Sequence, residues 1–311
     1  MKVFKRILVV ILVVIIAGFF YASWYFSGEI VTFAPVTIEG QLEVKKFHDL
    51  SEFGVRAEEV AFTTYEMSDK CEGEKLTLSG WFIPGRSPKS PTFVVLHGQN
   101  DNRIGSLKYS GMLARAGYNV LAYDHRYHGL SDGDYCTFGY FEGCDVSAAI
   151  DYLEGRGDCN TESLGVLGES MGGATAIMAA ARDNRIKLLV EDSSFSDLKT
   201  VVADYGKRLY GLPRFPLVDS AVFLAGVRAG FSPKMASPIK EIGKVTVPTL
   251  IIHCDCDEDI KPEYSELIYD SSGAEIKELH YFSGCGHTMG YEDHTGEYED
   301  LVLGFIKKNM P

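Results

Sequence analysis

The chain has 311 residues, with 30 Lys and Arg against 43 Asp and Glu, and its formal net charge is −13. Proteins that bind nucleic acids neutralise phosphates with a basic surface, so this charge argues against that class. Hydrophobic residues make up 46% and charged residues 23%, which are the proportions of one large globular domain or two smaller ones and exclude a disordered chain or a small disulfide scaffold.

Residues 7–26 form an uncharged apolar run of the length needed to cross a bilayer. Three cations precede the run, and it ends in an aromatic cluster: Phe19, Phe20, Tyr21, Trp24, Tyr25 and Phe26. We interpret residues 1–27 as a membrane anchor whose aromatic residues lie at the interface, with a cleaved signal peptide and a buried helix as the alternatives. The cations Lys2, Lys5 and Arg6 predict a cytoplasmic N-terminus and an extracytoplasmic body at the cell membrane.

Residues 28–58 are only weakly periodic, and we interpret them as a juxtamembrane connector with one helix near residues 40–53. From residue 59, short apolar runs alternate with amphipathic ones, which is typical of an α/β fold with a mostly parallel sheet. Eight strands are predicted, at residues 59–64, 76–83, 92–97, 119–125, 163–168, 186–192, 249–254 and 276–282. Helices are predicted at about residues 103–116, 140–155, 171–182, 262–271 and 297–309.

The segment between the sixth and seventh predicted strands, residues 193–246, is longer than an ordinary connection and contains four prolines. We therefore predict a small helical cap inserted at about residues 193–237. Its large apolar side chains are candidates for lining an acyl pocket, and packing of the cap on the core is the alternative. These candidates are Tyr205, Leu209, Tyr210, Phe215, Phe223 and Leu224.

The motif G-E-S-M-G at residues 168–172 lies between a predicted buried strand and an alanine-rich helix. At such a sharp strand-to-helix turn, the serine of a G-x-S-x-G motif is exposed as a nucleophile, and small residues beside it let strand and helix approach. We therefore predict that Ser170 is a nucleophile. A phosphate-binding loop is the alternative, but the chain has no G-x-x-x-x-G-K-[ST] motif to support it.

A serine hydroxyl is a poor nucleophile at neutral pH, so it needs a histidine base and an acid that orients the histidine. Both are expected after the serine, in the order acid then histidine, in loops at the carboxyl ends of parallel strands. We predict His287 as the base, with His280 and His294 as alternatives. Asp257 is the favoured acid, and the pattern leaves three others open: Asp192, Asp255 and Asp259.

Two backbone N–H groups should form an oxyanion hole, one from the residue after the nucleophile, Met171, and one from the loop H-G-Q-N at residues 97–100. We predict Gln99 as the second donor, with Asn100 as the alternative, and His97 as a structural loop residue. The segment D-H-R-Y-H-G-L-S, residues 124–131, is interpreted as a hydrogen-bonded loop beside the nucleophile rather than a metal site. No metal or cofactor is expected.

Several motifs together resemble the α/β-hydrolase superfamily over about residues 55–310: LHGQN, YDHRYHGLSDG, LGESMGGAT, IIHCDCDEDI and SGCGHTM, with RAGFSPKMASPIK near the end of the cap. The chain is most similar to membrane-anchored bacterial members related to serine aminopeptidase-like and feruloyl-esterase-like hydrolases. The resemblance implies an α/β-hydrolase domain over residues 59–311, with Ser170 as nucleophile, Asp257 as acid and His287 as base. The chain departs from the pattern at Cys254, where relatives usually carry Gly, and at Lys261, where Pro is common.

An odd number of cysteines leaves at least one thiol unpaired in a monomer. The seven are Cys71, Cys136, Cys144, Cys159, Cys254, Cys256 and Cys285. Cys136 and Cys144 are close enough in sequence to predict a loop disulfide. We also expect one bridge, from Cys285 to Cys254 or Cys256, to hold the acid loop against the histidine loop. A zinc site is the alternative, without C-x-x-C spacing to support it.

These features predict a serine hydrolase that cleaves carboxylic esters through an acyl-enzyme on Ser170. A serine aminopeptidase or amidase and an acyltransferase are alternatives on the same three residues, and a membrane-tethered binding protein on a hydrolase scaffold is the non-enzymatic one. The expected partners are a small-molecule acyl substrate and the membrane, through residues 7–26. Because residues 28–311 carry a net charge of −16, we expect neutral or cationic substrates.

Overall fold

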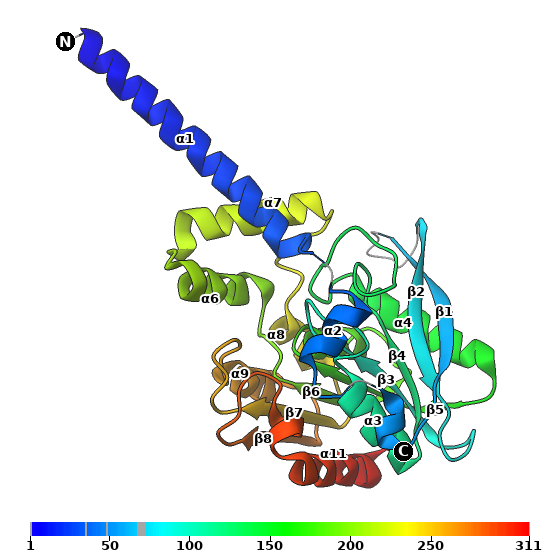
Figure 1. Ribbon diagram of the computed structural model, residues 1–311. Helices are drawn as coiled ribbons and strands as arrows, with labels where there is room; N and C mark the ends of the chain where they lie inside the picture. Colours follow the sequence, from blue (N-terminus) through cyan, green and yellow to red (C-terminus); the bar gives the residue numbers. More distant parts are fainter. Residues whose placement is uncertain (1, 35, 48, 67–72, 311) are drawn as a thin grey trace.

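The computed structural model describes residues 2–34, 36–47, 49–66 and 73–310, and its centre is one eight-stranded sheet (Figure 1). The strand order is β1-β2-β4-β3-β5-β6-β7-β8; β2 runs antiparallel to both β1 and β4, and all the other neighbours are parallel. The strands are β1 (Glu58–Tyr65), β2 (Lys75–Ile83), β3 (Pro91–Leu96), β4 (Asn119–Tyr123), β5 (Asn160–Glu169), β6 (Ile186–Asp192), β7 (Thr249–Cys254) and β8 (Lys277–Phe282). All eight predicted strands are present, so the predicted fold class is confirmed.

Helices cover both faces of the sheet, which explains why the central strands are apolar without alternation. One face packs against α3 (Leu107–Ala116) and α11 (Thr295–Asn309). The other packs against α4 (Glu142–Arg156), α5 (Met171–Ala180) and α9 (Glu263–Ser271). These five helices match the predicted ones to within a few residues. Three short elements complete the domain: α8 (Pro238–Glu241), η3 (Ile242–Lys244) and α10 (Gly290–Asp293).

The connector contains two short helices, α2 (Ile38–Val44) and η1 (Leu50–Phe53), so the prediction of one helix near residues 40–53 was wrong. The Thr37 hydroxyl accepts a hydrogen bond from the N–H of Gly40 and begins α2, whereas a capping box at Asp49 begins η1. Because each of these caps begins its own helix, the connector forms two short helices instead of one longer helix.

The helix that carries the apolar run, α1 (Lys2–Val31), is long and apolar enough to cross a membrane, with a mean hydropathy of 2.7 over its best 18 residues. It continues four residues beyond the predicted end of the anchor at residue 27. Its last turns pack against the cap, which consists of α6 (Leu198–Tyr210), η2 (Arg214–Val218) and α7 (Asp219–Arg228). In Figure 1 the first part of α1 projects away from the body, and α7 lies across its C-terminal end. The end of α1 is thus part of the folded body.

Candidate active site

Ser170 occupies a sharp turn between β5 and α5, with φ 53° and ψ −118°. A side chain rarely adopts this left-handed region unless the surroundings impose it. The neighbouring glycines show why the turn is possible: a Cβ at Gly168 would lie 2.2 Å from the carbonyl oxygen of Gly172, and one at Gly172 would lie 2.3 Å from the carbonyl oxygen of Leu96. Strand and helix therefore approach at a distance that only glycine permits, and the turn presents the Ser170 hydroxyl.

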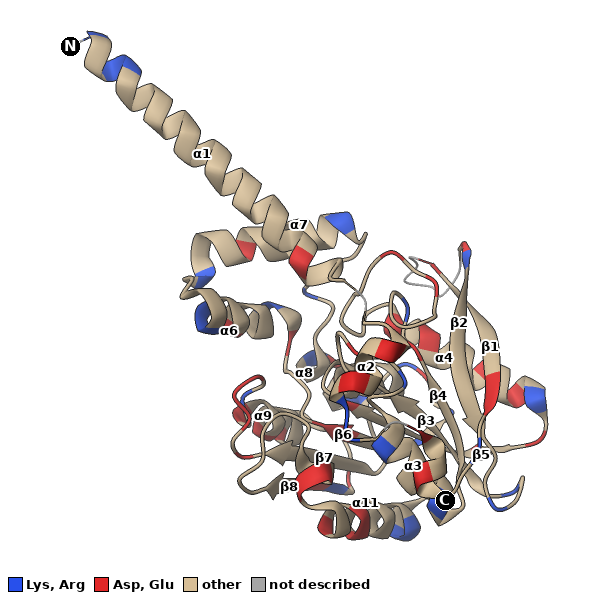
Figure 2. Cartoon of the chain, in the orientation of Figure 1, with Lys and Arg blue, Asp and Glu red and all other residues tan. Residues whose placement is uncertain are grey.

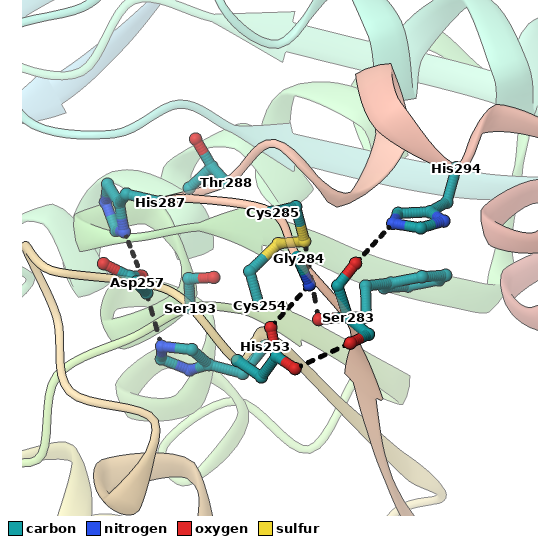
Figure 3. Close-up of a disulfide and its surroundings, with 12 residues drawn as sticks. Ser193, His253, Cys254, Asp257, Ser283, Gly284, Cys285, His287, Thr288 and His294 are labelled. Atoms are coloured by element: carbon teal, nitrogen blue, oxygen red, sulfur yellow. Dashed lines mark hydrogen bonds and ion pairs between the residues drawn. A yellow bond between two sulfur atoms is a disulfide. The ribbon is translucent and has the colours of Figure 1, made fainter.

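His287 lies between Ser170 and Asp257. Its Nε2 is 2.9 Å from Ser170 Oγ, and its Nδ1 is 2.6 Å from Asp257 Oδ2. The three side chains come from the loops that follow β5, β7 and β8, at the carboxyl ends of parallel strands of which only β7 and β8 are adjacent. Figure 3 shows His287 and Asp257 facing one another. Fold topology thus brings together residues that are separated by up to 117 positions.

The Asp257 carboxylate is buried and has four polar partners. Its Oδ1 accepts from the backbone N–H groups of Asp259 and Ile260, both at 2.8 Å. Its Oδ2 faces His287 and also His253, whose Nε2 is 3.2 Å away. Burial would raise the pKa of Asp257, but the hydrogen bonds from His253 and His287 outweigh it and hold that pKa well below its usual value. Asp257 is therefore an anion next to His287.

His253 is a site residue that the sequence reasoning did not select. It is fully buried at the end of β7, with Nδ1 2.6 Å from Ser265 Oγ and Nε2 3.0 Å from the carbonyl oxygen of Ile260. Burial lowers its pKa, but the hydrogen bond to Asp257 and the carbonyl of Ile260 outweigh burial and raise it. His253 begins the motif H-C-D-C-D-E-D-I, residues 253–260, and precedes Asp257 by four residues. This short spacing could have indicated that the two side chains are in contact.

The other candidate acids have different partners. Asp255 accepts hydrogen bonds from the hydroxyl of Ser283 and the N–H of Gly284, and Asp259 pairs with Arg208. The carboxylate of Asp192 accepts from three hydroxyl groups, those of Tyr109, Ser193 and Tyr298.

The alternative histidines also lie away from Ser170. His280 faces Glu297 at 3.6 Å, and the ring of His294 lies 3.0 Å from the carbonyl oxygen of Ser283. Of the acids and histidines considered, only Asp257 and His287 therefore lie in line with the serine.

The predicted oxyanion donors, Gln99 and Met171, both line the cavity beside Ser170, as does the alternative Asn100. Met171 is the first residue of α5, where N–H groups have no acceptor within the helix. The loop after β3 is close to Ser170, because a Cβ at Gly98 would lie 3.4 Å from Ser170 Cβ. Both N–H groups therefore belong to segments that border the serine.

The histidines next to this loop have structural partners. His97 is fully buried; its Nδ1 is 2.7 Å from the carbonyl oxygen of Gly98, and its Nε2 accepts from the N–H of His125 at 2.9 Å. Burial lowers the pKa of His97 well below its usual value and that of His128 to about 4. Arg126 pairs with Asp145 through two nitrogens. Within the part of the chain that the structure describes, no group of three His, Cys, Asp or Glu could hold a metal ion.

A disulfide joins Cys254 at the end of β7 to Cys285 in the loop after β8, which confirms the predicted bridge and selects Cys254 over Cys256 (Figure 3). Backbone hydrogen bonds run in parallel with it, from Asp255 N to Phe282 O at 2.9 Å and from Cys256 N to Cys285 O at 3.2 Å. The loops that carry Asp257 and His287 are thus fastened to each other.

The predicted bridge between Cys136 and Cys144 was wrong. Cys136 is a free, buried thiol whose Sγ contacts Met171 Sδ at 3.3 Å, next to Ser170 in the chain. Cys144 is disulfide-bonded, and Cys71 lies outside the described residues. Proximity in sequence therefore did not identify the partner of Cys144, because Cys136 remains a free thiol.

A cavity of about 510 Å³ opens beside Ser170 and His287 and is lined mostly by apolar side chains. Of the cap residues predicted to line it, Tyr205, Leu209 and Tyr210 do so, whereas Phe215, Phe223 and Leu224 are not part of its lining. Four further lining residues come from the end of α1 and the segment after it, and the sequence reasoning missed them: Phe26, Glu29, Ile30 and Phe33. Phe26, Ile30 and Phe33 are spaced as on one face of a helix, beyond the end of the apolar run. This pattern could have indicated that the helix continues and packs against the body.

The chain is similar to known proteins in sequence and in fold. Residues 57–226 match the family described as X-Pro dipeptidyl-peptidase (S15 family). The uncharacterized protein YqkD of Bacillus subtilis is 30% identical over 217 residues, which cover 69% of this chain and 70% of YqkD. The Pyrococcus furiosus esterase Pf2001 is 25% identical, with a TM-score of 0.68, over 86% of this chain and 98% of the esterase. The Pyrococcus horikoshii acylaminoacyl peptidase shares the fold, at 18% identity and a TM-score of 0.62, over 82% of this chain and 42% of the peptidase.

Proposed function

The chain belongs to the X-Pro dipeptidyl-peptidase (S15) family of the α/β-hydrolase superfamily, and from this premise we propose that it cleaves carboxylic esters through an acyl-enzyme on Ser170. The observation that carries the proposal is the position of His287, within hydrogen-bond distance of both Ser170 Oγ and Asp257 Oδ2. Nucleophile, base and orienting acid in this arrangement activate a serine that would otherwise be unreactive at neutral pH.

In the proposed reaction, Ser170 Oγ attacks the ester carbonyl while His287 Nε2 takes the hydroxyl proton. The Asp257 carboxylate stabilises the resulting imidazolium and holds its ring in place. The N–H groups of Met171 and Gln99 are the proposed donors to the tetrahedral oxyanion. His287 then returns the proton to the leaving alcohol. A water molecule, deprotonated by the same histidine, attacks the acyl-enzyme; the carboxylic acid leaves, and Ser170 Oγ takes this proton from His287.

Two observations favour esters over other acyl compounds. The cavity beside Ser170 is mostly apolar, which suits the acyl chain of an ester. The solved structure of Pf2001, which is 25% identical over most of this chain, is described as an esterase. Neither observation depends on the three proposed catalytic residues.

The proposal is tested by labelling the purified protein with a fluorophosphonate probe and by assaying p-nitrophenyl esters of increasing chain length. We expect labelling at Ser170, and a loss of at least about a thousandfold in kcat for Ser170→Ala, since only binding and the oxyanion hole then remain. Thermal unfolding of the variant controls for folding. An unlabelled wild-type protein, or a Ser170→Ala variant with full turnover, would support a binding protein on a hydrolase scaffold instead.

A peptidase is the second candidate, because the family description names X-Pro dipeptidyl-peptidase. Two carboxylates, Glu29 and Asp259, line the cavity, and an anionic group there could bind the ammonium group of a peptide N-terminus. The discriminating assay compares aminoacyl and X-Pro dipeptidyl p-nitroanilides with the p-nitrophenyl esters. A higher kcat/KM on any of these amides than on every ester would replace the ester proposal with the peptidase one.

We also propose that α1 anchors the protein in the cell membrane, with its N-terminus in the cytoplasm and the hydrolase domain outside. The apolar character of α1 and the three cations before it support this arrangement. Protease treatment of intact cells should digest a C-terminally tagged domain. A domain that resists digestion until the cells are lysed contradicts the orientation, and a mature protein that lacks residues 1–27 contradicts the anchor.

A further inference from the structure

The helix proposed to cross the membrane also forms part of the wall of the cavity at Ser170. Phe26, Glu29 and Ile30 of α1 line the cavity together with α6, and Phe33 continues this wall beyond the helix. If α1 served only as a tether, a flexible linker would be enough. Instead, the last turns of α1 and the cavity are parts of one folded unit.

Specific contacts hold α1 to the cap. The Arg228 guanidinium of α7 lies 3.6 Å from the ring centre of Trp24 and donates a hydrogen bond to the Trp24 carbonyl at 2.9 Å. The rings of Phe26 and Tyr210 pack edge to face, with centroids 5.3 Å apart. Residues 7–26 span about 30 Å as a helix, the thickness of a bilayer core, so Trp24 lies near the outer boundary of that core. The contacts with Arg228 and Tyr210 therefore place the cap at the same boundary.

The cap exposes large apolar side chains, each between 58% and 75% exposed: Leu209, Tyr210, Phe215, Phe223 and Val227. Single exposed apolar residues are ordinary on a soluble protein, but a group of them beside a membrane helix indicates a membrane contact. Leu209 and Tyr210 also line the cavity. The cavity wall therefore reaches the surface at this apolar part of the cap.

The charge of the cap differs in sign from that of the rest of the body. Residues 198–229 carry five Lys and Arg against two Asp, although residues 28–311 as a whole carry −16 (Figure 2). Amphipathic helices that lie on membranes combine an apolar face with cations that attract anionic lipids. The cap has both exposed apolar side chains and a net positive charge, although the whole chain is acidic.

We propose that the cap rests on the bilayer that holds α1, and that the cavity takes the acyl chain of a lipid ester directly from this bilayer. The inference rests on the proposed serine-hydrolase function and specifies its substrate class. The acyl group passes to Ser170 Oγ, the lipid alcohol leaves with the proton from His287, and water then releases a fatty acid. The end of α1 thereby positions the substrate and anchors the enzyme.

The test uses the full chain reconstituted in vesicles of phosphatidylcholine and phosphatidylglycerol. A long-chain monoacylglycerol is placed either in the same vesicles or in separate protein-free vesicles, and fatty acid release is measured by mass spectrometry. We expect hydrolysis at least about tenfold faster when enzyme and lipid share a bilayer. The double variant Phe223→Ser/Val227→Ser should lower lipid hydrolysis severalfold and leave p-nitrophenyl acetate hydrolysis unchanged, since neither residue lines the cavity.

The matched control is Leu267→Ser, which removes an exposed apolar side chain from α9 and should alter neither rate. Equal rates in the two vesicle arrangements, an unchanged rate of lipid hydrolysis in the cap variant, or no lipid hydrolysis at all would overturn the inference. Failure of the proposed function gives a different result, because the wild-type protein would then hydrolyse no soluble ester and would not react with a fluorophosphonate.

Discussion

His253 Nε2 lies 3.2 Å from Asp257 Oδ2, and we expect this contact to hold the proposed acid in position against His287. Glutamine can place an amide nitrogen near the position of the imidazole Nε2, whereas asparagine is too short to do so. We therefore expect His253→Asn to lower kcat by about ten- to a hundredfold with little change in KM, because a hydrogen bond to a charged group contributes about 1.5–3 kcal/mol. His253→Gln should retain most of kcat. Steady-state kinetics on a soluble ester measures both variants, and equal kcat values in the two would contradict a positioning role.

Glu191 makes stability depend on pH in a direction opposite to that of most carboxylates. It is fully buried in β6, and burial raises its pKa to about 7. Between about pH 4.5 and 7, Glu191 is protonated in the folded state and ionised in the unfolded state. The free energy of unfolding therefore falls as pH rises through this range. Glu191→Gln, which is always neutral, should match the wild type at pH 5 and exceed it by about 3 kcal/mol at pH 8.

Urea unfolding at the two pH values tests the effect of Glu191. The control is Glu162→Gln, which neutralises an exposed carboxylate on β5 and should show no such difference between pH 5 and pH 8. A Glu191→Gln variant that is less stable than the wild type at both pH values would show that the carboxylate is ionised and satisfied in the folded protein.

At the level of elements, the disulfide between Cys254 and Cys285 connects the two loops that carry Asp257 and His287. It closes a loop with a sequence separation of 31, which corresponds to about 3–4 kcal/mol in the chain-entropy description. We expect Cys254→Ala/Cys285→Ala to lose up to this amount of stability. We also expect it to lower kcat more than it raises KM, because the contact between His287 and Asp257, the proposed base and acid, loosens.

Cys256→Ser is the matched control for the disulfide, since Cys256 is a free, exposed thiol in the same loop. Dithiothreitol should lower the activity of the wild type and of Cys256→Ser. Any remaining effect of the reductant on the double alanine variant reports the disulfide of Cys144. A double variant with wild-type kcat would show that the backbone hydrogen bonds between the loops are sufficient.

Elements whose burial follows from composition could be predicted from the sequence, and those that depend on distant contacts could not. Strands β3 and β7 are largely apolar runs covered on both faces, so their type was evident and their predicted bounds lie within one residue of those observed. The helix α2 has only seven residues, and its contact between Gln41 and Asp101 joins segments 60 residues apart.

The same distinction applies to the candidate site. Ser170 and His287 lie in local motifs, and their mutual approach could be predicted. The choice of Asp257 over Asp255 and Asp259 depended on which carboxylate the folded loop places against His287. His253 and the α1 part of the cavity wall were missed, because only the fold brings them to the site.

At the scale of the whole molecule, the N-terminal helix has two parts with different surroundings. The described side chains from residue 2 to Ala22 are all at least partly exposed, whereas Ser23 and Ser27 are fully buried and Ile30 and Val31 join the apolar cluster of the cap. The first part is suited to lipid and the second to protein. A truncation placed between them should therefore separate anchoring from folding.

We expect a protein that begins at residue 23 to stay folded and to hydrolyse soluble esters at the wild-type rate. One that begins at residue 37 loses the burial of Ile30 and Val31, about 3–6 kcal/mol at 1.5–3 kcal/mol for each side chain. It also loses the α1 wall of the cavity, so KM for long-chain p-nitrophenyl esters should rise severalfold while KM for the acetate changes little. Thermal unfolding and chain-length profiles of the two truncations provide the measurement. Identical profiles would show that α1 is a tether alone, because the cavity would then hold the acyl chain without it.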